Sequence, residues 1–302
     1  MKLAVYAICK NEEKQVDAWL DAILPELKED DSIIVVDTGS TDETVAKFKA
    51  RGVEPYSVHI SPWRFDTARN TALSLCPADC DYAWSLDLDE RPSKGWRGIL
   101  ESQTIGPSRF RYHFVWNRNK DGSEGITFYA DKLHSRNGFT WKGIAHEWLS
   151  YEGSESQVWV EGLGVEHYQD HSINRLDRDL RLMERAIKEH PDNERLQHYY
   201  ARQLLWCGQN VRAAEWFLKH LDNPKSTWRH ERSESMLYLS KCGGNDAWID
   251  MWIYRAVAEC PERREVWFAL ADRLRVKGEV EMADYYDAKA RSMKKDKFYL
   301  SK

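Results

Sequence analysis

Residues 33–42 read Ile33-Ile34-Val35-Val36-Asp37-Thr38-Gly39-Ser40-Thr41-Asp42, an apolar run that ends in a polar turn. Four consecutive β-branched residues are typical of a parallel strand that is buried on both faces of a sheet. Helical spacing follows from Thr41 to Ala50, and Ser40 or Thr41 is suited to cap that helix. A strand followed at once by a helix is the repeating unit of an open α/β sheet.

The same alternation extends along the first half of the chain. Strands are predicted at Leu3–Cys9, Glu54–Ile60 and Tyr82–Leu86, and helices at residues 16–27 and 66–75. After Pro92 the pattern changes, because Arg109–Trp116 and Ile126–Leu133 are strand-like segments on either side of a hairpin signal at residues 119–122. We therefore expect an α/β sheet that is extended by an antiparallel insertion.

The second half of the chain is predicted to be helical and periodic. Gly208, Gly243 and Gly278 are 35 residues apart. The segment Ala-Ile-Lys-Glu-His-Pro at 186–191 returns as Ala-Val-Ala-Glu-Cys-Pro at 256–261. A period of about 34 residues with a turn glycine and a closing proline resembles tetratricopeptide repeats, which are stacked helical hairpins. The sequence therefore predicts a sheet domain at residues 1–172 and an all-α repeat domain at residues 173–302.

Composition excludes several classes of protein. The 302 residues are 42% hydrophobic and 31% charged, which is enough to bury sizeable cores and does not indicate disorder. No apolar run approaches the roughly 20 residues of a transmembrane helix, and the N-terminus resembles a strand rather than a signal peptide. The six cysteines do not form a disulfide pattern, and Cys76 and Cys80 lack the second Cys/His pair of a zinc site. We expect a cytoplasmic protein with reduced thiols.

The net charge of −5 is unevenly spread along the chain. From residue 173 onward there are 25 basic and 21 acidic residues, whereas the first 172 residues contain 19 basic and 28 acidic residues. An acidic first half favours divalent metal ions, and a mildly basic second half is compatible with an anionic partner.

Polar side chains follow three of the predicted strands. Asn11 follows the first strand, Asp37 and Asp42 the second, and Asp87 and Asp89 the strand at residues 82–86. Because ligands collect beyond the carboxyl ends of parallel strands, we expect these side chains to share one edge of the sheet. In an extended segment Asp87 and Asp89 project to the same side, and paired carboxylates suit Mg²⁺ or Mn²⁺. The sequence therefore predicts a metal site that leaves positions for substrate phosphates.

Four motifs, in order and spacing, resemble family 2 glycosyltransferases of the GT-A fold over roughly the first 170 residues. They are Ala7-Ile8-Cys9-Lys10-Asn11-Glu12, Val35-Val36-Asp37-Thr38-Gly39-Ser40-Thr41-Asp42, Ala68-Arg69-Asn70 and Leu86-Asp87-Leu88-Asp89-Glu90. The resemblance implies a Rossmann-like sheet that binds a nucleotide-sugar, with uridine diphosphate as the favoured carrier. It implies that Asp37 contacts the base and ribose and that Arg69 lies near the nucleotide. It further implies Mn²⁺ or Mg²⁺ on the diphosphate at Asp87 and Asp89, and it places Asn11 and Asp42 in the donor site.

Two later segments complete the predicted site. Residues 141–148 contain His146-Glu147, which is similar to a pair in family members joined to helical repeats, including lipopolysaccharide-core and peptide S-glycosyltransferases. Inverting transfer needs a base for the proton of the acceptor, and we expect Glu147 to be that base with His146 beside it. The alternative for Glu147 is a buried structural ion pair with Lys142 or an arginine.

The resemblance also implies one late histidine on the metal or phosphate. His167 fits that place better than His171, and the alternative is a histidine packed at a strand end.

The sequence therefore predicts an inverting, metal-dependent glycosyltransferase whose acceptor stays open. A peptide or protein is favoured because helical repeats offer concave binding surfaces, and a modified DNA base because the repeats are rich in Trp and Tyr that stack on bases. A lipopolysaccharide or another saccharide chain is the third option. The repeats are also compatible with a homodimer. The competing class is a non-catalytic, repeat-based binding protein with a vestigial nucleotide-sugar fold.

Overall fold

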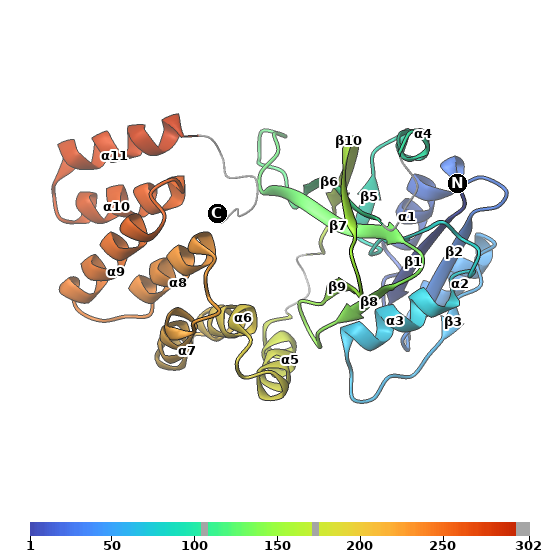
Figure 1. Cartoon of the computed structure of the whole chain (residues 1–302), viewed down its shortest axis with the longest axis horizontal. Coiled ribbons are helices and arrows are strands. Elements are labelled where there is room, and N and C mark those ends of the chain that lie inside the picture. Colours follow the sequence, from blue (N-terminus) through green and yellow to red (C-terminus); the bar gives the residue numbers. More distant parts are fainter. Residues whose placement is uncertain (104–107, 171–174, 294–302) are drawn as a thin grey trace. The chain divides into compact units, whose positions relative to one another are not determined.

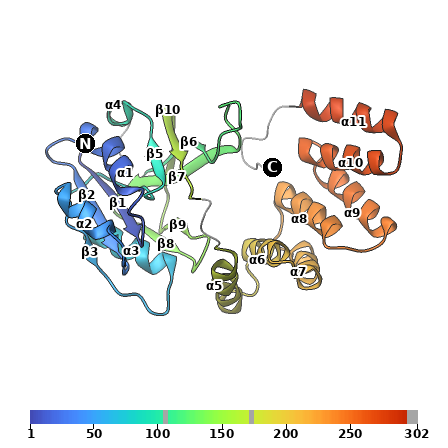
Figure 2. The ribbon, with the colours of Figure 1, turned by 180° about the vertical axis from the view of Figure 1, so that it is seen from behind.

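The computed structural model describes residues 1–103, 108–170 and 175–293 (Figures 1 and 2). The chain divides into two compact units, residues 1–172 and 173–302. His171 and the junction between the units lie outside the described residues. Every helix in the described part of the chain is too short or too polar to span a bilayer.

The first unit is built on an eight-stranded sheet with the order β3-β2-β1-β4-β7-β6-β10-β5. Its strands are β1 (Leu3–Cys9), β2 (Ser32–Asp37), β3 (Tyr56–Ser57), β4 (Tyr82–Ser85), β5 (Glu90–Pro92), β6 (Ser108–Val115), β7 (Thr127–Ser135) and β10 (Ser156–His167). Strands β1 to β4 are parallel, and β7 runs antiparallel to both β4 and β6. β10 pairs parallel with β6 and antiparallel with β5. The predicted α/β sheet with an antiparallel insertion is confirmed.

Helices and a small hairpin cover the two faces of this sheet (Figure 1). These elements are α1 (Val16–Ile23), the 3₁₀ turn η1 (Leu24–Glu26), α2 (Thr44–Ala50), α3 (Phe65–Leu75), α4 (Trp96–Glu101), β8 (Phe139–Lys142) and β9 (Trp148–Tyr151). Trp19 of α1, Phe48 of α2 and Trp96 of α4 belong to the core on one face. Leu73 of α3 and Trp141 of β8 belong to the core on the other face.

Three predicted boundaries are wrong for local reasons. Helix α1 stops short of its predicted end because Pro25 has no backbone N–H to continue the helix, and the chain forms η1 instead. The strand predicted at Glu54–Ile60 shortens to β3, which lies at the sheet edge and pairs with only two residues of β2. Helix α2 begins at Thr44 rather than Thr41, because Asp42 accepts hydrogen bonds from the backbone N and hydroxyl of Thr44.

Within residues 175–293 the second unit consists of seven helices joined by short connections. They are α5 (Leu176–Glu189), α6 (Glu194–Trp206), α7 (Asn210–Asp222), α8 (Arg229–Lys241), α9 (Asp246–Glu259), α10 (Arg264–Val276) and α11 (Val280–Ser292). The pairs α6–α7, α8–α9 and α10–α11 pack as hairpins. Gly208 and Gly278 stand in equivalent turns with φ angles of 73° and 81°, a conformation that glycine adopts without strain. The predicted all-α repeats are confirmed.

Candidate active site

The ends of β1 and β2 fix the first predicted donor-site residue. The two strands are parallel, and Cys9 stands opposite Asp37 in the register. Asp37 is buried and accepts hydrogen bonds from the backbone N atoms of Gly39 and Ser40, both at 3.1 Å. The loop after β2 therefore folds around the Asp37 carboxylate and holds it at the carboxyl edge of the sheet.

Asn11 and Asp42 connect the loops that follow β1 and β2. Asn11 Oδ1 accepts a hydrogen bond from the backbone N of Thr41 at 2.8 Å. Asp42 accepts one from the backbone N of Glu13 at 3.2 Å. Burial acts to raise the pKa of Asp42, but the hydrogen bonds from Thr44 and Glu13 hold it below its usual value. These contacts give both residues a role in shaping the loops, and direct contact with a donor stays a prediction.

Arg69 of α3 brings Asp87 and Glu147 together. Its Nη1 and Nη2 donate to the two carboxylate oxygens of Asp87 at 2.8 and 3.1 Å, and its Nε donates to Glu147 Oε1 at 2.6 Å. Nη1 also donates to Ser85 Oγ at 2.9 Å, and the guanidinium lies 5.0 Å from the ring centroid of Trp141. Burial lowers the pKa of Arg69, but the two carboxylates outweigh it and keep that pKa raised. Glu147 thus has the ion-paired arrangement that the sequence left as an alternative, with an arginine as its partner.

Two charged residues that the sequence did not single out support Asp87. Lys132 of β7 donates its Nζ to Asp87 Oδ2 at 2.9 Å and contacts Glu90 Oε1. Glu90 Oε2 accepts a hydrogen bond from the backbone N of Asp87 at 3.0 Å. Burial raises the pKa of Glu90 despite Lys132, whereas the burial of Asp87 is outweighed by Arg69 and Lys132, which lower its pKa. Glu90 could have been selected from the sequence, because it is the last residue of a recognised motif. Lys132 lies 45 residues from Asp87, so only the fold reveals their contact.

Asp89 and His167 form the part of the site that suits a divalent ion. Residues 87–90 form a turn rather than the expected extended segment, so Asp87 and Asp89 contact different partners. Asp89 Oδ2 is 3.2 Å from His167 Nε2, and His167 Nδ1 is 3.3 Å from the carbonyl oxygen of Trp116. That carbonyl accepts only from a protonated Nδ1, so Nε2 is the nitrogen available to an ion beside the carboxylate. The donor atoms of Asp89 and His167 therefore fit Mn²⁺ or Mg²⁺, with further positions left to substrate and water.

Two predicted site residues have an unusual backbone conformation. Among the described residues, Asn11 and His146 are the only non-glycine residues with positive φ, at 56° and 52°. This conformation is strained for a side chain such as histidine, and strain of this kind concentrates at functional sites. His146 is exposed in the loop between β8 and β9. Asn70 of α3 holds β8 through two hydrogen bonds of 2.8 Å with the backbone of Trp141, so α3 also positions Glu147.

The predicted site residues fall into three groups. They are Arg69 with Asp87 and Glu147, Asp89 with His167, and the loop residues Asn11, Asp37 and Asp42, with His146 next to Glu147 in the chain. The three predicted metal ligands do not form one cluster. In the part of the chain that the structure describes, the one group of three or more His, Cys, Asp or Glu residues whose ligand atoms all lie within 4.8 Å of one another belongs to the second unit.

Comparison with known proteins gives one family match. Residues 4–100 match the sequence model of glycosyl transferase family 2. No curated protein matches the chain.

Several solved structures are similar to parts of the chain. Glucosyl-3-phosphoglycerate synthase from Mycobacterium tuberculosis, in complex with Mn²⁺, uridine diphosphate and glucosyl-3-phosphoglycerate, is 25% identical over 37% of this chain and 44% of that chain, with a TM-score of 0.30. MamA is 17% identical over 42% of this chain and 76% of that chain, with a TM-score of 0.34. A thermophilic TPR protein from Thermus thermophilus is 19% identical over 40% of this chain and 66% of that chain, with a TM-score of 0.32.

The chain spans less than half the length of the synthase structures that it matches. The family match shows that residues 4–100 of the first unit resemble family 2 glycosyltransferases. The paired helices of the second unit resemble tetratricopeptide repeats.

Proposed function

We propose that this chain is an inverting, metal-dependent glycosyltransferase that moves a sugar from a UDP-sugar to a nucleophilic acceptor. The observation that carries the proposal is that Arg69 contacts both Asp87 and Glu147. Asp87 lies just beyond the end of β4. Asp89, two residues after Asp87 in the chain, lies 3.2 Å from His167, and the pair offers donor atoms for a divalent ion. A donor site, an ion site and a carboxylate base at one sheet edge are the parts that sugar transfer needs. The family match at residues 4–100 supports a nucleotide-sugar as the donor.

On this proposal the donor lies over the carboxyl ends of β1, β2 and β4. Asp37, fixed by two backbone N–H groups, contacts the base and ribose. Arg69 fixes the orientation of Asp87 at the donor side of the site. Asp89 and His167 would hold Mn²⁺ or Mg²⁺, and a bound ion supplies positive charge against the departing diphosphate.

Glu147 accepts the proton of the acceptor in this proposal. Its Oε1 is held by Arg69 Nε at 2.6 Å, so the orientation of the carboxylate is fixed and Oε2 is the atom that we assign to the proton. We assign the neighbouring His146 to the orientation of the acceptor, because its strained backbone keeps it on the exposed side of the loop. The ion pair with Arg69 and the role as base are compatible, because one carboxylate has two oxygens.

The acceptor that we favour is a peptide or protein, because stacked helical hairpins present binding surfaces to polypeptides. A modified DNA base and a saccharide chain are the other outcomes that the experiment distinguishes. A homodimer through the repeats belongs to the same proposal.

The test offers the purified full chain a set of nucleotide-sugars with Mn²⁺ and pools of peptides, DNA and glycans, and identifies products by mass spectrometry. We expect one sugar to be added to one acceptor class, and only with the divalent ion. The matched variants are Asp89→Asn and Asp79→Asn, because Asp79 is an exposed aspartate that pairs with Lys2 at 2.7 Å. Only Asp89→Asn should abolish transfer. A folded wild-type protein that neither hydrolyses nor transfers any sugar would favour the non-catalytic binding protein.

A further inference from the structure

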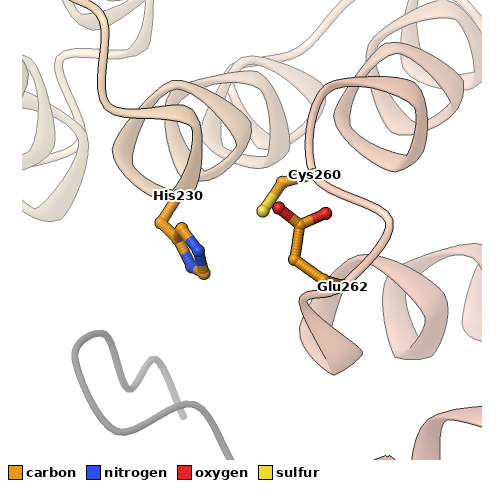
Figure 3. Close-up of side chains that lie close together, drawn as sticks. All are labelled: His230, Cys260 and Glu262. Atoms are coloured by element: carbon orange, nitrogen blue, oxygen red, sulfur yellow. The ribbon is translucent and has the colours of Figure 1, made fainter.

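His230, Cys260 and Glu262 converge in the second unit (Figure 3). His230 lies in the first turn of α8, Cys260 directly follows α9, and Glu262 lies in the connection to α10. One imidazole nitrogen, the Cys260 Sγ and one carboxylate oxygen all lie within 4.8 Å of one another. The sequence alone gave no signal for this cluster, because 30 residues separate His230 from Cys260.

The two segments that carry these side chains are fixed by other contacts. The buried Arg263 donates its Nη1 to the carbonyl oxygen of His230 at 3.0 Å, and its backbone N donates to the carbonyl oxygen of Cys260 at 3.1 Å. Trp267 Nε1 donates to the carbonyl oxygen of Pro261 at 2.7 Å. The backbone on both sides of the cluster is therefore held in place by the fold itself, which is the preorganisation that a ligand site needs.

The chemistry of the three side chains selects one kind of ion. A thiolate, an imidazole and a carboxylate are the ligands of Zn²⁺, whereas Mg²⁺ and Mn²⁺ prefer oxygen ligands. Bonds of about 2.0–2.3 Å around a tetrahedral ion place its ligand atoms roughly 3.3–3.8 Å apart. The Glu262 side chain is 47% exposed, so its rotation can close the remaining separation and open a path for the ion. Three protein ligands leave one position of a tetrahedral ion for water.

Charges of both signs surround the cluster, because Glu262 and the end of α9 are negative whereas Arg229 and Arg263 are positive. The C-terminus of α9 carries a partial negative charge, and Arg229 is already drawn to it, with Nε donating to the carbonyl oxygen of Glu259 at 2.7 Å. Arg229 Nη1 is 3.1 Å from Glu262 Oε1. This ion pair is exposed on both sides and therefore weak, so an ion can take one oxygen of Glu262 while Arg229 keeps the backbone carbonyl or the other oxygen.

The repeat structure does not require a cysteine at position 260. The positions equivalent to Cys260 and Glu262, 70 residues earlier, hold His190 and Asp192. Both His190 and Asp192 are exposed, whereas Cys260 is fully buried. Helix packing at this turn therefore tolerates a histidine and does not by itself account for the buried cysteine, whereas an exposed carboxylate follows two residues later in both repeats.

We propose that His230, Cys260 and Glu262 bind one Zn²⁺, with water as the fourth ligand, and so join the start of α8 to the loop after α9. On binding, the Cys260 thiol releases its proton to water and the thiolate bonds to the ion. The site does not depend on glycosyl transfer, and it goes beyond the function proposed above.

The experiment treats the full chain with a chelator, removes the chelator and titrates the protein with Co²⁺, a spectroscopic substitute for Zn²⁺. We expect a thiolate-to-cobalt charge-transfer absorption that saturates at one Co²⁺ per chain and disappears when Zn²⁺ is added. Cys260→Ser should lose this absorption, whereas Cys242→Ser, at the half-buried cysteine that follows α8, should keep it. Asp89→Asn should also keep it, which separates this site from an ion held by the first unit.

A second pair of variants guards against misfolding of Cys260→Ser. Glu262→Gln changes an exposed side chain and should weaken Co²⁺ binding at least about tenfold, whereas Glu279→Gln, also exposed, should not change it. A wild-type titration without thiolate absorption, an absorption that persists in Cys260→Ser, or unchanged affinity in Glu262→Gln would overturn the proposal.

Discussion

Both units of the chain bury charged side chains, but they bury them in different surroundings. In the first unit the side chains of Asp87, Asp89 and Glu147 keep 29%, 18% and 12% of their surface exposed, in loops next to strand ends. In the second unit His198 and Arg263 are fully buried and Glu234 is 3% exposed, between packed helices.

The buried polar side chains of the second unit form hydrogen bonds with one another between the helices of the repeats. His198 Nδ1 is 2.8 Å from Ser235 Oγ, which is 2.9 Å from His220 Nδ1. His220 Nε2 is in turn 2.8 Å from Ser226 Oγ. These hydrogen bonds connect α6, α7, α8 and the loop before α8, so the network specifies how the helices pack.

Buried charge by itself therefore does not identify a functional site. In the first unit Asp87 and Asp89 follow the parallel strand β4 and keep partial exposure, and Glu147 follows His146 with its positive φ. The same unit also buries Asp31 completely in an ion pair with Arg97, without such access. In the second unit the buried charges coincide with helix packing. A perturbed charge is informative about function only together with access and placement in the fold.

The largest effect should follow from Asp89→Asn. Metal-dependent donor turnover should fall below detection, because the Asp89 carboxylate is the oxygen ligand that we propose for the ion, whereas the Asp87 carboxylate is paired with Arg69. Thermal unfolding should change little. Asp87→Asn should abolish turnover too, but it should also cost about 3 kcal/mol of stability, because the buried Arg69 and the largely buried Lys132 lose their shared counter-charge. Release of uridine diphosphate and calorimetric unfolding measure the two effects. Normal turnover in folded Asp89→Asn would contradict the proposed ion site at Asp89 and His167.

Glu147→Gln should come next in size. Transfer to the acceptor should fall by about 10²–10⁴ while donor binding persists, because the amide keeps the shape of the side chain but cannot take a proton. Glu155→Gln is the matched control, since Glu155 also pairs with an arginine in the first unit, at 3.0 Å from Arg109. Single-turnover transfer and donor titration separate the two quantities. Near-normal transfer by a stable Glu147→Gln protein would exclude it as the base.

Glu234→Gln should damage stability and leave the chemistry intact. It removes a carboxylate that pairs with His198 at 3.5 Å and with Arg263 at 3.7 Å inside the repeats, so we expect a loss of about 3 kcal/mol in the unfolding of the second unit. Exposed Glu279→Gln should stay within about 0.5 kcal/mol. Denaturant unfolding with hydrogen exchange in α6 and α8 measures this, and donor turnover per folded molecule should not change. Reduced turnover in fully folded Glu234→Gln would contradict the conclusion that the buried charges of the second unit serve helix packing alone.

Acidification should weaken the second unit. Burial lowers the pKa of His198, so the folded state keeps it neutral while the unfolded chain binds a proton below the ordinary value of about 6.5. Stability from His198 is therefore present above that pH and is lost on acidification, by on the order of 1 kcal/mol per pH unit. Glu234 has a lowered pKa, despite its burial, because His198 hydrogen-bonds to its carboxylate and Arg263 carries a positive charge nearby. The contribution of Glu234 to stability is lost at lower pH still. Hydrogen exchange in α6 between pH 7 and 5 measures the loss, and constant protection would contradict it.

The smallest effect should distinguish two exposed tryptophans of the first unit, Trp116 directly after β6 and Trp159 in β10. The ring of Trp116 lies 4.3 Å from that of His167, whereas Trp159 packs on Tyr129. Trp116→Ala should weaken Mn²⁺ binding by about tenfold, because the His167 ring loses the contact that orients it. Trp159→Ala should leave Mn²⁺ binding unchanged. Equal affinities in the two variants would remove Trp116 from the positioning of His167.

The sequence predicted the elements whose patterns are local. The apolar run at residues 33–36 and the 35-residue glycine spacing identified the buried sheet and the repeats. The exact ends of helices and strands depend on contacts that the hydrophobic pattern does not reveal. An example is the pair of hydrogen bonds from Thr44 to Asp42, because of which α2 begins at Thr44. The edge strand β3 shortened because little of β2 pairs with it.

The acidic residues of the candidate active site could be predicted from the sequence, but the lysine that pairs with them could not. The proposed zinc site of the second unit could not be predicted either. Asp87 and Asp89 stand in a recognisable motif, whereas Lys132 reaches Asp87 only because β7 is inserted beside β4. The division of the two aspartates between Arg69 and His167 depends on a turn that the motif does not reveal. His230 and Cys260 meet only through the stacking of the repeats.

The proposed function requires that the carboxyl edge of β1, β2 and β4 binds a nucleoside diphosphate together with a divalent ion at Asp89 and His167. Calorimetric titration of uridine diphosphate into the full chain, with Mn²⁺ and after chelation, measures this binding. We expect one uridine diphosphate to bind per chain, and we expect this binding to require Mn²⁺, to be lost in Asp89→Asn and to persist in Glu147→Gln. Folded wild-type protein that does not bind uridine diphosphate, or that binds it equally well without Mn²⁺ and in Asp89→Asn, would contradict the proposal.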